Sequence, residues 1–328
     1  MSDSAYYKNM DIKNMKNQSK ILIGSIVLLF CILTLISLAG CRSTPKGRLP
    51  LYVRPEPSTL RIINDLEAQQ KLLQNFAKAY PNKIRDVKFL NEDWSMLVND
   101  KRFYFANGRF LPEELRKQWE EYLPYDFYVY PWTGTAKERQ IELENPVYSI
   151  GSSFLFDTLY SSPTEEESLK WQVNYSFFGV PMLIHSDIKP LLDKISDLIH
   201  AAAQTEPSVN EWIAELQTTQ SSYGWNWRNI ADTNRRSNHS YGIAIDLLPI
   251  DLGDRLTYWR WNMNDNISVK TIDSTTYYLP PETVIKIFEE YGFIWGGSWS
   301  LIDTMHFEYR PEILLVNGIE PLNMNNIK

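Results

Sequence analysis

The sequence predicts an α+β protein whose folded part follows a targeting segment and a spacer. Hydrophobic residues make up 44% and aromatic residues 13% of the 328 residues, which is ample for a packed core. Some segments place apolar residues at helical spacing, and others alternate apolar with polar residues as strands do. We expect an N-terminal accessory α+β region over 59–165 and a second folded region over 166–320.

The first 41 residues predict a membrane anchor. Four lysines within the first 20 residues precede an uncharged apolar run over 21–40, and the run ends in Leu38-Ala39-Gly40-Cys41, which resembles the bacterial lipobox. In this interpretation Cys41 receives the lipid and begins the mature chain. The alternative is an uncleaved signal anchor, because about 20 apolar residues can span a bilayer. Both interpretations place the folded part outside the cytoplasmic membrane, in the cell envelope, since the lysine-rich flank stays on the cytoplasmic side.

The accessory region follows a proline-rich stretch over 42–58, which we interpret as an extended spacer. Apolar spacing predicts a helix over 60–80. Alternation over 94–111 predicts strands, with turns at Asn99-Asp100 and Asn107-Gly108, and a polar helix is expected after Pro112. No residue pattern in this region indicates a catalytic or binding function.

The second region carries three amphipathic stripes, which predict helices around 188–199, 209–216 and 284–291. The third has a start signal at Pro281 and a stop signal at Gly292.

Composition excludes several classes of function. Cysteines occur only at 31 and 41, so the folded part has no thiol for cysteine catalysis, a Cys-zinc site or a disulfide. The net charge is -7, from 33 basic and 40 acidic residues, without a basic stripe. Nucleic acid is therefore not expected as a partner.

Two of the four histidines, His239 and His306, lie in segments that resemble strands with one apolar face. In the first segment, strand alternation turns Gly242, Ala244 and Asp246 away from the apolar face, and small residues there would keep the space above a metal open. In the second segment, His306 and Glu308 share a face opposite Met305, Phe307 and Tyr309.

His239, Asp246 and His306 form a ligand set that suits Zn2+ and leaves a fourth position for water. Asp303, three residues before His306, is the candidate general base. Glu308 is expected to be a strand-face partner or an outer support for a ligand rather than the base.

Arg228 is the candidate positive group for an oxyanion or a peptide carboxylate, with Arg235 and Arg236 as alternatives. Ser237 either binds substrate or forms a turn before a strand. The other two histidines, His185 and His200, are interpreted as structural.

Two motifs carry a family resemblance. Residues 237–246 fit S-x-H-x-x-G-x-A-x-D, and Trp299, Asp303 and His306 fit W-x-x-x-D-x-x-H. This pattern resembles the D-alanyl-D-alanine carboxypeptidase family of zinc peptidases, which includes the L-alanyl-D-glutamate endolysins of bacteriophages. The resemblance covers about 220–315.

The resemblance implies a small α+β domain with a central antiparallel sheet, zinc on His239, Asp246 and His306, and cleavage of peptidoglycan stem peptides. It places Arg228 where the family has its upstream arginine, and Trp299 near the cleft. Asp303 stands where the dipeptidase branch has glutamate, which makes this chain more similar to the endolysin-like and carboxypeptidase-like branches.

We therefore expect a zinc peptidase domain over 166–320 that hydrolyses peptidoglycan stem peptides as a D-alanyl-D-alanine carboxypeptidase. The alternatives are an L-alanyl-D-glutamate endopeptidase and a non-catalytic wall-binding lipoprotein that retains the fold.

Overall fold

The computed structural model describes residues 62, 64–125, 127, 129–133, 152–217, 223–230, 235–249, 251–259 and 276–322. The anchor predicted at 1–41 and the spacer at 42–58 lie outside these residues. Within the described part, no helix combines the length and the apolar character needed to cross a membrane. The described residues all belong to one compact unit.

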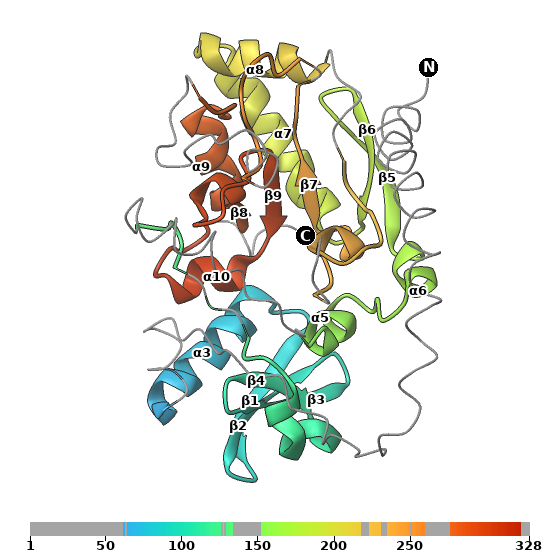
Figure 1. Ribbon diagram of the computed structural model, residues 1–328, viewed down its shortest axis with the longest axis vertical. Coiled ribbons are helices and arrows are strands. Elements are labelled where there is room, and N and C mark those ends of the chain that lie inside the picture. The colour runs from blue at the N-terminus through green and yellow to red at the C-terminus, as the bar shows by residue number, and fades with distance from the viewer. Residues whose placement is uncertain are drawn as a thin grey trace, which may run out of the picture. The chain divides into compact units, whose positions relative to one another are not determined.

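A helix and a four-stranded sheet make up most of the accessory region (Figure 1). Helix α3 (Leu66–Ala79) begins at Asp65, whose side chain accepts hydrogen bonds from the backbone N–H groups of Glu67 and Ala68. The sheet is antiparallel in the order β1-β2-β3-β4. Its strands are β1 (Ile84–Leu90), β2 (Asp93–Val98), β3 (Lys101–Ala106) and β4 (Arg109–Pro112).

Both predicted turns are confirmed, since Asn99, Asn107 and Gly108 have positive φ and connect paired strands. Strand β1 was not predicted, because most of its side chains are exposed and a register shift interrupts its pairing. The helix expected after Pro112 is a 3-10 helix, η1 (Glu113–Glu121).

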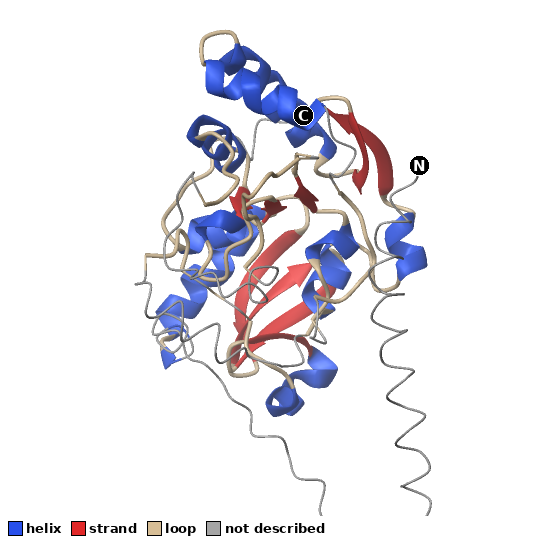
Figure 2. Ribbon diagram, turned by 45° about the horizontal axis from the view of Figure 1, so that its top comes forward, coloured by secondary structure: helices blue, strands red, loops and turns tan. Residues whose placement is uncertain are grey.

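The three helices predicted in the second region are confirmed as α7 (Lys189–Ala203), α8 (Pro207–Gln217) and α9 (Glu282–Glu290). Gly292 follows α9 with a φ of 86°, as its role as a stop requires. Three elements before α7 were not predicted: α5 (Phe154–Leu159), α6 (Glu165–Leu169) and the hairpin of β5 (Gln172–Phe177) and β6 (Val180–His185). Figure 2 shows this hairpin apart from the four-stranded sheet.

The central antiparallel sheet that the resemblance implied is confirmed, with the strand order β7-β9-β8. Its strands are β7 (Ala244–Asp246), β9 (His306–Tyr309) and β8 (Phe293–Trp295). Asp246 pairs with His306 and Ala244 with Glu308, so these four side chains share one face. On the other face, Phe307 stacks on Phe288 of α9 with ring centroids 4.2 Å apart.

One hydrophobic core extends through both regions. It contains Phe76 of α3 and Phe110 of β4 as well as Ile184 of β6 and Phe307 of β9. Helix α3 also lies beside α10 (Pro311–Val316), and the side chain of Asn75 donates to the backbone carbonyl of Leu315 (Figure 1). The boundary expected between 165 and 166 stays a prediction.

Candidate metal centre

A short 3-10 helix, η2 (Asn238–Tyr241), places His239. Ser237 begins it, with a side chain that accepts from the His239 backbone N–H at 3.4 Å. Gly242 ends it in the left-handed conformation, with a φ of 70°. The prediction that the strand runs through Gly242 is therefore wrong, because β7 begins only at Ala244.

The expectation that Gly242 keeps the space above the metal open is also wrong. A Cβ at this position would lie 2.7 Å from the backbone nitrogen of His185 and would collide with the side chain of Gln172. Gly242 thus faces the β5–β6 hairpin. It is needed for the turn and for this close approach.

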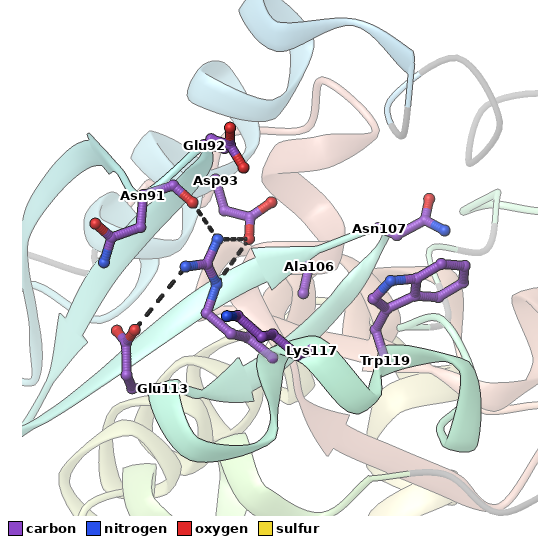
Figure 3. Close-up of a pocket in the computed structure, with 9 residues that line it drawn as sticks. Asn91, Glu92, Asp93, Ala106, Asn107, Glu113, Lys117 and Trp119 are labelled. Atoms are coloured by element: carbon purple, nitrogen blue, oxygen red, sulfur yellow. Dashed lines mark hydrogen bonds and ion pairs between the residues drawn. The ribbon is translucent and has the colours of Figure 1, made fainter.

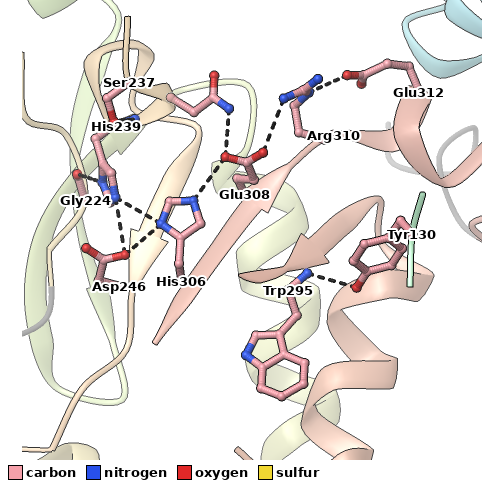
Figure 4. Close-up of polar contacts among 11 residues, drawn as sticks. Tyr130, Gly224, Ser237, His239, Asp246, Trp295, His306, Glu308, Arg310 and Glu312 are labelled. Carbon is pink, nitrogen blue, oxygen red and sulfur yellow. Dashed lines mark hydrogen bonds and ion pairs between the residues drawn. The ribbon is translucent and has the colours of Figure 1, made fainter. Parts of the chain in front are cut away.

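The three predicted ligands converge (Figure 4). Asp246 Oδ1 lies 2.9 Å from His306 Nδ1 and 3.3 Å from His239 Nε2, and the two imidazole nitrogens are 3.3 Å apart. All three residues are buried. The sheet register sets Asp246 opposite His306, and η2 adds His239 from the side of β7.

This spacing fits a tetrahedral metal ion. Bonds of about 2.0–2.1 Å to zinc place neighbouring ligand atoms roughly 3.3 Å apart. His239 Nδ1 lies 2.7 Å from the backbone carbonyl of Gly224, and His306 Nε2 lies 3.0 Å from Glu308 Oε2. Because both partners are acceptors, each imidazole can donate through its outer nitrogen, while its inner nitrogen faces Asp246.

The electrostatics favour a charged centre. Burial opposes ionisation of Asp246, but His239 and His306 outweigh it and hold the pKa of this carboxyl well below its usual range. Burial likewise disfavours a charged His306, yet Asp246 and Glu308 raise its pKa to about 10. A metal ion competes with that proton for the same lone pair, so metal binding releases it.

Glu308 is a second carboxylate behind His306. Burial opposes its ionisation, but His306, Arg310 and Asn238 together lower its pKa to about 2. The Asn238 side chain donates to Glu308 Oε2 at 2.7 Å, which connects η2 to β9 next to both histidines. Asn238 and Arg310 were not predicted as part of the site. The position of Arg310 two residues after Glu308 was the one available signal for it.

Asp303 lies just before β9 and has a carboxyl oxygen, Oδ1, that is buried without a hydrogen-bond partner among the described residues. Burial and Asp246 raise the pKa of Asp303 to about 7, against the opposing charges of His306 and Arg228. A Cβ at Gly296 would lie 3.1 Å from the Cβ of Asp303, so glycine is what lets the two segments meet. The carboxyl can therefore exchange a proton near neutral pH.

Trp299 lies beside the cluster, with its ring centroid 5.2 Å from that of His306. This agrees with the place that the resemblance implied. Ser237 has the contacts of a turn-forming serine, which was one of its two alternatives.

Two of the arginine candidates, Arg228 and Arg236, differ in their surroundings. Arg228 is exposed, and its charge is close enough to Asp303 to lower the pKa of that carboxyl. Arg236 instead stacks on Trp227 at 4.0 Å and pairs with Asp157 at 3.6 Å. The structure thus brings Arg228 towards the site and engages Arg236 elsewhere. The catalytic roles of Asp303, Arg228, Ser237 and Trp299 stay predictions, and Cys41 lies outside the described residues.

A hollow of about 620 Å³ lies far from this cluster in sequence, between the β1–β2 turn and η1 of the accessory region (Figure 3). Three of its charged groups pair with one another: Arg116 donates to Asp93 at 3.0 Å and 2.6 Å and forms an ion pair with Glu113. The metal-binding group lines none of it. We therefore place the candidate active site at the cluster and not at the hollow.

Comparison with known proteins supports this assignment. Residues 231–309 match the family described as D-alanyl-D-alanine carboxypeptidase, which confirms the resemblance. Together with the three converging ligands, the match supports a metallopeptidase. Residues 72–127 match a separate family described as a domain of unknown function. No curated protein and no solved structure matches the chain significantly.

Proposed function

From the family match over 231–309, we propose that this chain is a zinc-dependent peptidase of peptidoglycan stem peptides, of the D-alanyl-D-alanine carboxypeptidase type. One observation carries the proposal. Within the matched segment, two imidazole nitrogens and a carboxylate oxygen turn their lone pairs to a common point at the spacing of zinc ligands.

His239, Asp246 and His306 would hold the ion. When bound, zinc polarises the scissile carbonyl and lowers the pKa of a coordinated water. Asp303 accepts the proton of the attacking water and returns it to the leaving amine as the peptide C–N bond breaks. Burial raises the pKa of this carboxyl to about 7 in the metal-free protein, which brings it closer to the range where one group can both accept and return a proton.

Arg228 supplies the fixed positive charge. It is exposed, so a substrate carboxylate can reach it, and it lies on the side of Asp303. Trp299 packs against His306 and walls one side of the metal site. An acidic peptide end could thus pair with Arg228 near the proton-transfer group Asp303.

We propose further that the enzyme works outside the cytoplasmic membrane, anchored through Cys41 or through the apolar run over 21–40. The spacer over 42–58 would then set how far the peptidase reaches into the wall. The partners are the membrane and the peptidoglycan peptide, without nucleic acid.

Two alternatives share the ligand set. Asp303, in place of glutamate, favours an L-alanyl-D-glutamate endopeptidase as much as a carboxypeptidase. A non-catalytic wall-binding lipoprotein would keep the metal but would not need a partnerless buried carboxyl oxygen at Asp303.

Mass spectrometry of muropeptides incubated with the zinc-loaded, detergent-solubilised full chain distinguishes the three. Loss of one terminal D-alanine supports the carboxypeptidase, and release of larger stem fragments supports the endopeptidase. Unchanged muropeptides with zinc bound would favour the binding protein. The His306→Ala variant serves as the control for metal-independent cleavage.

A further inference from the structure

A buried row of charged side chains leads away from the metal site along β9 and into α10 (Figure 4). Glu308, Arg310 and Glu312 are 5%, 8% and 0% exposed. Glu308 holds His306 through Oε2 and accepts from Arg310 Nη1 at 3.3 Å through Oε1. Arg310 Nε donates to Glu312 Oε1. The row is therefore continuous from a metal ligand to α10.

The far end of the row is built by the accessory region. The hydroxyl of Tyr125 accepts from Arg310 Nη2 at 2.8 Å and donates to Glu312 Oε1 at 3.0 Å. The hydroxyl of Tyr80, at the end of α3, donates to Glu312 Oε2 at 2.6 Å. Phe156 of α5 adds a ring 5.0 Å from the Arg310 guanidinium. Tyr80 and Tyr125 both fall in 72–127, the segment that matches the domain of unknown function.

Each member of the row depends on the next, because a buried charge is costly unless it is paired and hydrogen-bonded. The row holds two carboxylates and one guanidinium, and the two tyrosine hydroxyls donate to the outer carboxylate that would otherwise be under-satisfied. Without those donors, Glu312 and Arg310 would have to rearrange. Glu308 would then lose its hydrogen bond from Arg310.

Glu308 matters because it fixes the tautomer and the ring orientation of His306. Such outer partners of a metal-bound histidine are worth roughly 10–100-fold in metal affinity. A change at the far end of the row would reach the metal through the same bonds.

We propose that the accessory region is a positioning element of the metal centre: Tyr80 and Tyr125 hold Glu312 and Arg310, which hold Glu308 and so orient His306. The inference rests on the proposed zinc site and assigns a role to a region whose sequence indicated none. Tyr80, Tyr125, Arg310 and Glu312 are positioning residues, since none of them touches the reacting groups.

The test is the zinc dissociation constant of the full-length chain, measured by competition with a chromophoric chelator. We expect zinc to bind roughly tenfold more weakly in Arg310→Lys and in the double variant Tyr80→Phe/Tyr125→Phe. The matched control is Tyr104→Phe, which removes the hydroxyl of a buried tyrosine of β3 whose partners, Glu113 and Asn91, lie outside the row. The control should bind zinc as the unchanged chain does.

A second readout separates positioning from general loss of stability. With cobalt(II) in place of zinc, the visible absorption bands should shift in Arg310→Lys and stay unchanged in Tyr104→Phe, even where both variants melt at a lower temperature. Zinc affinity and cobalt spectra equal to those of the unchanged chain would overturn the inference. If the double variant does not fold, the single variants Tyr80→Phe and Tyr125→Phe decide for the accessory region, and Arg310→Lys decides for the row.

Failure of the inference is distinguishable from failure of the proposed function. The dissociation constant is measured without a peptide substrate, so it reports on metal binding and its support and not on peptide cleavage. Muropeptides left intact by a fully zinc-loaded, unchanged chain would instead count against the peptidase.

Discussion

The metal cluster and the hollow of the accessory region both gather charged side chains, but they arrange them in opposite ways. In the hollow, Arg116 lies between Asp93 and Glu113, so cations and anions neutralise one another. In the cluster, His239, Asp246 and His306 turn acceptor atoms towards one point, with 2.9–3.3 Å between them. Only a proton or a cation between those atoms offsets their repulsion.

The difference between the cluster and the hollow shows which property of a group of charged side chains indicates a catalytic or metal-binding site. Hollow volume favours the accessory region, whereas the convergence of three possible ligand atoms favours the cluster. The buried, partnerless oxygen of Asp303 adds an unsatisfied group next to the cluster. We therefore weigh convergent ligand atoms above the size of a hollow.

The largest expected effect is loss of the metal. Asp246→Ala removes one of three ligands, so zinc should bind more than about 100-fold more weakly, beyond the range typical of outer partners. Asp93→Ala, which removes a carboxylate of the hollow, should retain stoichiometric zinc. Metal analysis after dialysis checks both variants. Equal zinc retention in the two would remove the distinction between cluster and hollow.

The next effect is on turnover with the metal retained. Asp303→Asn keeps the shape of the side chain but removes its ability to accept a proton, so kcat should fall by about 10²–10⁴-fold. Zinc content should remain that of the unchanged chain, because Asp303 is outside the ligand set. A variant that loses zinc together with activity would show that Asp303 supports the ligands instead of transferring protons.

A third expectation concerns pH. Burial raises the pKa of Asp303 to about 7 in the metal-free protein, and a nearby divalent cation favours the ionised form, so the pKa of the loaded enzyme lies at or below 7. The base is the ionised form. Below that pKa, kcat/KM should therefore fall by about tenfold per pH unit, and above it the value should level off. Rates measured between about pH 5 and pH 8 show the acidic limb. Rates that rise on acidification would contradict the role of Asp303 as a base.

The sequence was sufficient for the elements with strong periodicity and for the residue types of the ligand set. Helices α7, α8 and α9 each carry an apolar stripe, and the turns at Asn99 and Asn107 carry their own signals. Strand β1 was not predicted because its side chains are mostly exposed and its pairing with β2 shifts register. A one-turn 3-10 helix before a three-residue strand cannot be told from a longer strand by alternation alone, which is why η2 was misassigned.

The supporting contacts lay beyond sequence reasoning for a different reason. Arg310 meets Tyr125 across 185 positions, and Tyr80 meets Glu312 across 232. No local pattern connects residues so far apart. Ligand identity follows from side-chain chemistry, whereas the partners that orient a ligand follow from tertiary packing.

The smallest expected effect tests the turn that places His239. Gly242→Ala puts a Cβ on a backbone with a φ of 70° and within 2.7 Å of the His185 nitrogen. Gly179→Ala, at a φ of 87° in the β5–β6 turn, adds the same kind of strain with nothing within 4 Å of the new Cβ. The strain alone costs about 1–2 kcal/mol of unfolding free energy.

Gly242→Ala should therefore destabilise the chain more than Gly179→Ala does, and the difference measures the close approach of η2 to the hairpin. Denaturant unfolding of the metal-free chain gives both values. Because η2 also orients His239, Gly242→Ala should weaken zinc binding while Gly179→Ala should not. Equal losses of stability with unchanged zinc affinity would mean that the hairpin moves aside and that the turn is positioned by its own hydrogen bonds.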